Sequence, residues 1–143
     1  CYNGHIELRN REFMKYRVFQ FQLSDSIIDR MSKGTATDAD NAIYRQYLDC
    51  VMIPTVERVI AVRSCYKEVA VIEADDLEEV FTIGNIGDED NESAIQYLAP
   101  MHSISVGDVI VDESNVAHLV DRIGFKELTQ YTANQVEEYV EFV

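Results

Sequence analysis

The sequence predicts a single α+β domain with a mixed or mainly antiparallel sheet of about five strands, and helices packed mainly on one face of it. Strand and helix patterns alternate in the first half of the chain, and a strand–turn–strand pattern dominates the second half. The length of 143 residues fits one domain. The apolar fraction of 47% is ordinary for a globular protein and argues against global disorder. No apolar run approaches the ~20 residues of a membrane-spanning helix.

Residues 1–13, CYNGHIELRNREF, have little apolar content and no clear hydrophobic period. We interpret them as a leader derived from a cloning vector or, if they are native, as a flexible arm. The α+β domain is therefore expected to span residues 14–143. It begins with a methionine that leads directly into a strand.

The first strand is predicted at residues 15–23, where aromatic and β-branched side chains recur at period two. Phe19, Phe21 and Leu23 share one face of this strand and are expected in the core. Ser24 is a typical N-cap residue for a short helix, and Gly34 is a typical residue to end it.

A longer helix is predicted from Thr37 or Asp38 onward, and Pro54 interrupts it because proline lacks the backbone N–H. Apolar residues then predict a second, interior strand over residues 66–73. A compact helix is expected at residues 75–83, with Gly84 as its C-cap. Residues 84–93 are predicted to form a polar loop, and residues 94–98 a short strand.

The second half predicts a hairpin. Apolar residues 109–111 and 116–120 flank a polar turn at residues 112–115, and a last short strand is expected at residues 125–128. Residues 133–143 place valines and Tyr139 on one side and glutamates on the other at helical spacing. We therefore expect an amphipathic C-terminal helix with an acidic face.

The net charge of −14 is unevenly distributed along the chain. Residues 1–72 contain ten Lys/Arg and nine Asp/Glu, whereas residues 73–143 contain two Lys/Arg and seventeen Asp/Glu. Such an acidic half repels phosphate backbones, which argues against direct nucleic-acid binding. It attracts basic protein surfaces and speeds their encounter. The alternative is that the acidity only keeps the protein soluble or reflects a salty habitat.

The stretch from His102 to Leu128 has the most distinctive pattern, HSxSVGD followed by two strands and GFxEL. It resembles the YodL-like and related uncharacterised domains of bacterial plasmids, phages and other mobile elements. The resemblance covers roughly the last third of the chain. It implies an accessory gene of a mobile element and carries no catalytic residue to transfer. The matching residues are His102, Ser103, Ser105, Val106, Gly107, Asp108, Gly124, Phe125, Glu127 and Leu128.

Catalytic and metal sites find little support in the sequence. His102 and His118, with Asp108, Asp112 and Glu113, contain suitable ligand types but no tight ligand spacing. Residues 88–92 lack the alternating oxygen ligands and central glycine of an EF-hand. Cys50, Cys65, Ser103 and Ser105 lack the context of a nucleophile. We therefore predict no enzyme activity, no metal and no cofactor.

The predicted binding site is instead an acidic array that contacts a basic protein in the cytoplasm, and a DNA-binding protein is the more specific form of this partner. In its sharpest form this is DNA mimicry, since a duplex carries one negative charge per ~1.7 Å of axis. The alternatives are a sheet-based interaction module, in which the hairpin at residues 105–120 pairs with a partner chain, and a metal-binding or enzymatic domain that uses His102 and His118. The array comprises Asp75, Asp76, Glu78, Glu79, Asp88, Glu89, Asp90, Glu92, Glu137, Glu138 and Glu141.

Overall fold

The computed structural model describes residues 13–86 and 94–142. A six-stranded sheet runs through the molecule in the order β3-β2-β1-β4-β5-β6, and each pair of neighbouring strands is antiparallel. The strands are β1 (Met14–Phe21), β2 (Tyr66–Ala74), β3 (Ile95–Tyr97), β4 (Val109–Val111), β5 (Ala117–Val120) and β6 (Phe125–Glu127). The predicted α+β class and mainly antiparallel sheet are confirmed, with six strands where about five were expected.

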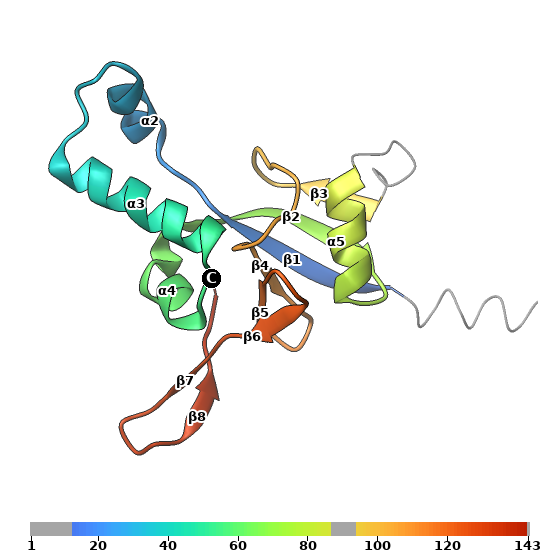
Figure 1. The fold of residues 1–143 in the computed structure, drawn as a ribbon. Coiled ribbons are helices and arrows are strands. Elements are labelled where there is room, and N and C mark those ends of the chain that lie inside the picture. Colours follow the sequence, from blue (N-terminus) through green and yellow to red (C-terminus); the bar gives the residue numbers. More distant parts are fainter. Residues whose placement is uncertain (1–12, 87–93, 143) are drawn as a thin grey trace, which may run out of the picture.

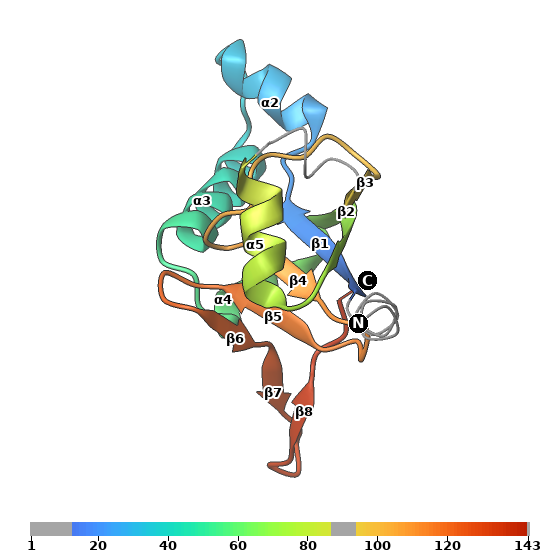
Figure 2. The ribbon, with the colours of Figure 1, turned by 90° about the vertical axis from the view of Figure 1, so that its right-hand side faces the viewer.

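Within the described residues, the helical elements beside the sheet are α2 (Asp25–Ser32), α3 (Asp38–Met52), α4 (Val56–Ala61), the short 3-10 helix η1 (Arg63–Cys65) and α5 (Leu77–Ile86). Helices α3 and α4 lie on one side of the sheet and α5 lies on the other, while α2 projects beyond the sheet (Figure 1, Figure 2). Most of the helical cover is therefore on one face, and α5 covers only part of the opposite face.

The helix starts follow the predicted capping residues. The Ser24 hydroxyl accepts a hydrogen bond from the Ile27 N–H at 3.2 Å. Thr37 and Asp40 form a reciprocal capping box at the start of α3. Helix α3 ends at Met52, and α4 begins after Thr55, so the helical segment is interrupted at Pro54 as expected. The N-terminal half of the chain is thus well described by its local sequence signals.

The sheet has a hydrophobic core on each face. Phe19 and Phe21 of β1 pack with residues of α3 and α4 on one face. Tyr16 and Val18 of the same strand pack with Val80 of α5 on the other face. Because successive side chains of a strand point to opposite faces, β1 contributes to both cores.

The predicted C-terminal helix is wrong. Residues of this region form a two-stranded hairpin, β7 (Thr129–Tyr131) and β8 (Glu137–Tyr139). After β8 the chain buries Val140 and Phe142 in the α3–α4 core and leaves Glu141 exposed, which is a period of two rather than 3.6. Glu137, Glu138 and Glu141 therefore do not share a helix face.

Gly84 is not the C-cap of α5, because the helix continues to Ile86. A Cβ at this position would overlap the Ile104 side chain. The missing side chain instead lets the segment around Ile104 approach the helix, and the Ile104 N–H donates to the Gly84 carbonyl at 3.3 Å. The predicted acidic loop at residues 88–92 lies outside the described residues.

Candidate functional site

The acidic residues at the start of α5 divide between capping and exposed positions. The Glu79 N–H donates to Asp76 Oδ1 at 2.8 Å, and the Asp75 N–H donates to Glu79 Oε1 at 2.9 Å. Asp76 and Glu79 therefore satisfy backbone groups at the helix start, where negative charge is favoured. The side chains of Asp75, Asp76 and Glu78 are nevertheless exposed to solvent.

Asp75 and Asp76, together with two carboxylates of another segment, act on Tyr16 of β1. Burial raises the pKa of the Tyr16 phenol, and four negative charges raise it further. The charges come from two different segments, the β2–α5 junction and the turn after β4. They belong to Asp112, Asp76, Glu113 and Asp75.

A second convergence surrounds Tyr139 of β8. A hydrogen bond to Glu127 and its negative charge raise the pKa of the Tyr139 phenol, and Glu137 and Asp112 add to the effect. Asp112 influences both tyrosines and so connects the two groups. We call the combined set the acidic band, which comprises Asp75, Asp76, Asp112, Glu113, Glu127 and Glu137.

Strand register explains how these residues come together. Arg17 of β1 lies opposite Val111 of β4, which brings Tyr16 and Asp112 to the same end of the sheet. His118 of β5 lies opposite Glu127 of β6, and its Nε2 is 2.9 Å from Asp112 Oδ2. The acidic band therefore crosses several strands, on the face that α5 covers only in part.

The structure places only some of the predicted site residues in this band. Asp75, Asp76 and Glu137 belong to it, whereas Glu138 points to the opposite face of β8 from Glu137. Glu141 borders a small cavity beside Arg17 instead. Asp112, Glu113 and Glu127 were missed as partner-binding residues, because only the hairpin register brings them to the other carboxylates.

The band also has basic neighbours. Lys15 and Arg17 line a shallow cavity of about 570 Å³ together with Asp112 and Glu113. Arg17 Nε is 3.1 Å from Glu68 Oε2, and the backbone N–H of Lys15 donates to Glu113 Oε2 at 3.0 Å. Since Arg17 is paired with Glu68, its charge is largely balanced locally.

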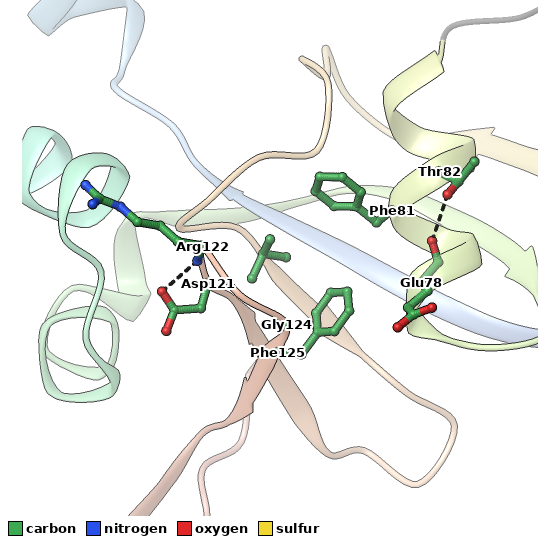
Figure 3. A pocket seen from close by; sticks show the side chains of 8 residues that line it. Glu78, Phe81, Thr82, Asp121, Arg122, Gly124 and Phe125 are labelled. Carbon is green, nitrogen blue, oxygen red and sulfur yellow. Dashed lines mark hydrogen bonds between the residues drawn. The ribbon is translucent and has the colours of Figure 1, made fainter.

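Glu78 borders a different cavity, of about 280 Å³, between α5 and the turn from β5 to β6 (Figure 3). Phe81 and Phe125 line it from opposite elements, and Arg122 points away from it toward α3 (Figure 3). The Arg122 guanidinium donates to the Met52 carbonyl at 2.7 Å. The cavity is small, and its lining combines Glu78, Thr82 and Asp121 with the apolar side chains of Phe81, Val120 and Phe125.

The HSxSVGD stretch builds a buried polar cluster rather than an open site. Gln20 Nε2 donates to Asp108 Oδ2 at 3.0 Å and to the His102 carbonyl at 2.9 Å. The Ser105 N–H donates to the same Asp108 oxygen at 2.9 Å. Burial raises the pKa of Asp108 to about 6 against the lowering effect of these bonds. We call Gln20, His102, Ser105 and Asp108 the buried polar cluster, in which Gln20 and Asp108 are buried and the exposed residues His102 and Ser105 contribute backbone groups.

The remaining candidates for chemistry have structural partners. His102 Nδ1 lies 2.8 Å from the Ser103 carbonyl oxygen. Cys50 is buried, and its burial raises the pKa of the thiol, which disfavours the nucleophilic thiolate. Across residues 13–86 and 94–142, no group of three or more His, Cys, Asp or Glu side chains is arranged to hold a metal ion.

The hairpin that contains residues 105–120 has no free backbone edge within its strands. Strand β4 lies between β1 and β5, and β5 lies between β4 and β6. In the described part of the chain, no helix has the length and apolar character needed to cross a membrane. No family model, curated protein or solved structure matches this chain.

Proposed function

We propose that this chain is a non-enzymatic accessory protein of a bacterial mobile element, which acts in the cytoplasm by binding a basic protein through the acidic band. The mobile-element origin rests on the resemblance of residues 102–128 to YodL-like domains. The observation that carries the binding role is the convergence of carboxylates from the β2–α5 junction and the β4–β5 turn on Tyr16. Clustered like charges create a field that recruits an oppositely charged surface.

DNA mimicry is the sharpest form of this proposal. A basic DNA-binding protein recognises a row of phosphate charges, and its affinity falls steeply as salt rises. The acidic band offers carboxylates across adjacent strands, at an end of the sheet where Asp75, Glu113, Glu127 and Glu137 are exposed. The partner in this form is a host or element protein whose DNA-binding surface the band occupies.

The test is capture of partners from a bacterial lysate at low and high salt, followed by competition with duplex DNA. We expect to capture a basic protein that elutes as the salt concentration rises. Duplex DNA should also displace this protein from the immobilised chain. Salt-sensitive binding without displacement by DNA would remove the mimicry and leave the acidic interaction. Binding that does not respond to salt would overturn the acidic interaction itself.

A further inference from the structure

Strands β6 and β7 form one extended run, residues 125–131, at the edge of the sheet. Strand β6 pairs with β5, and β7 pairs with β8. The junction is Leu128, whose N–H donates to the Ala117 carbonyl at 2.8 Å and whose carbonyl accepts from the Val140 N–H at 3.0 Å. Because the N–H and C=O of one strand residue point to the same side, β5 and β8 lie along the same edge of this run.

The opposite edge of the run is therefore unpaired within the described structure. The Asp121 N–H bonds to the Gly124 carbonyl, and the Thr132 N–H bonds to the Val136 carbonyl. With Leu128, these bonds show that even-numbered residues face β5 and β8. The backbone groups of Phe125, Glu127, Thr129 and Tyr131 consequently point outward. Figure 1 shows β7 and β8 extending away from the main sheet.

A groove follows this outer edge between α4 and β7. It has a volume of about 490 Å³, and its wall on the helix side consists of the apolar residues Val56, Ile60 and Ala61 together with Glu57. On the strand side all three residues of β7 line it. Consecutive strand side chains point to opposite faces, so a groove bordered by all three meets the strand at its edge.

We propose that this edge takes up an extended, basic segment of the partner protein as an additional antiparallel strand. The inference rests on the proposed function and specifies how its partner is held. An added strand would place alternate side chains against the apolar wall of α4 and the others toward the face that carries Glu127. The expected partner sequence therefore alternates apolar residues with Lys or Arg.

Charge selects this occupant over a second copy of the chain. Glu57 and Glu127 are exposed beside the edge, and Glu137 is exposed on the neighbouring strand β8. The nearby Lys126 Nζ is 2.8 Å from Asp121 Oδ2, which balances its charge. Two copies paired along this edge would bring two chains of net charge −14 together. Like charges in facing positions of a strand pair are destabilising, whereas lysines there complement the glutamates.

The direct test uses a synthetic peptide that alternates lysine and valine, and follows backbone amide exchange by NMR. The amides of Glu127, Thr129 and Tyr131 are expected to exchange at least about tenfold more slowly with peptide. The Leu128 and Gln130 amides, which face the partner strands, serve as internal controls and should change little. Unchanged exchange at the three outward amides under peptide saturation would overturn the proposal, as would protection that appears without peptide through self-association.

Matched variants separate backbone pairing from charge. Thr129→Pro removes one outward N–H, whereas Thr129→Ala keeps it and removes only the hydroxyl that bonds to Glu137 Oε2. The proline variant should bind the peptide about tenfold more weakly than the alanine variant. A peptide of the same composition, in which all lysines precede all valines instead of alternating with them, should also bind weakly to the wild-type chain.

The outcomes distinguish this inference from the function on which it rests. If the two Thr129 variants and the two peptides bind alike, and binding still falls as salt rises, the strand pairing is overturned and the acidic interaction remains. If binding does not respond to salt, the proposed function fails. Peptide-induced protection of the outward amides would then still report strand pairing at this edge.

Discussion

The buried polar cluster and the acidic band are both built around carboxylates, but their surroundings differ. Asp108 is 3% exposed, and Gln20 and the Ser105 N–H bond to it. Asp75 and Glu113 are exposed beside other negative charges. Among the described residues, no buried side-chain nitrogen or oxygen lacks a partner. The cluster thus has its polar groups satisfied internally, whereas the band carries charge that an external partner can satisfy.

The most patterned stretch of the chain therefore stabilises the fold. His102, Ser105 and Asp108 hold the loop before β4 against Gln20 of β1. The band depends on residues without a recognisable motif, drawn from separate segments. Substitutions in the cluster should therefore change stability, and substitutions in the band should change binding.

The largest effect is expected from Gln20→Ala. The change removes the bonds to Asp108, to the His102 carbonyl and from the His102 N–H, and leaves buried polar groups unsatisfied. We expect the free energy of unfolding to fall by about 3–4 kcal/mol, measured by urea denaturation. Gln22→Ala is the control, because it removes one exposed bond to the Pro100 carbonyl. Equal losses for the two glutamines would contradict the structural role of the cluster.

Gly107→Ala should destabilise the chain by about 2–3 kcal/mol. Gly107 has a φ of +95°, and a Cβ there would overlap the backbone carbonyl of Cys50, which cannot move as a side chain can. Gly124→Ala provides the comparison, because Gly124 has a φ of +73° but no atom within 4 Å of an added Cβ. Thermal or urea unfolding should show the larger loss at Gly107, and a larger loss at Gly124 would be inconsistent with this packing.

The free energy of unfolding should depend on pH through the protonation of Asp108. Burial raises its pKa from the ordinary 3.8 to about 6, so the folded chain keeps a proton that the unfolded chain releases. The resulting stabilisation is full below about pH 4 and is lost as the pH rises through about 6. Relative to Asp108→Asn, the wild-type chain should lose roughly 2 kcal/mol over this window. The free energy of unfolding is measured by urea denaturation at each pH. If it changed with pH in the same way in both proteins, the pKa of Asp108 would not be raised.

The smallest effect on stability is expected in the band. The triple variant Asp75→Asn, Glu113→Gln and Glu137→Gln keeps hydrogen-bond acceptors at exposed positions and removes charge. Its free energy of unfolding should stay within about 0.5 kcal/mol of the wild-type value. A loss comparable to that of Gln20→Ala would mean that the band, like the cluster, has a structural role.

Local sequence signals predicted most of the fold. The capping residues Ser24 and Thr37, the break at Pro54 and the hairpin of residues 109–120 correspond to elements of the structure. The C-terminal segment was misassigned because its valines and glutamates also fit a helical period. This segment is extended because β7 pairs with β8 and because Val140 and Phe142 are buried, and both interactions favour extended structure over a helix.

Less of the candidate site could be predicted from the sequence. Acidity of the second half was evident, but the grouping of Asp112 with Asp75, Asp76 and Glu127 depends on the register of strands far apart in the chain. The free edge at residues 125–131 likewise depends on which strands pair with β6 and β7. Neither property has a local signal, since both arise only when the sheet is assembled.

Whether the acidic band is a binding surface is tested by comparing two variants of equal net charge in binding polylysine at low salt, measured by calorimetry. One is the triple band variant, and the other neutralises exposed Asp25, Asp38 and Asp49 of α2 and α3 to Asn. Three lost exposed charge contacts should weaken binding by about tenfold in the band variant. The control should remain within about twofold of the wild-type affinity. Equal weakening of both variants would show that only net charge matters, and would contradict a binding surface at the acidic band.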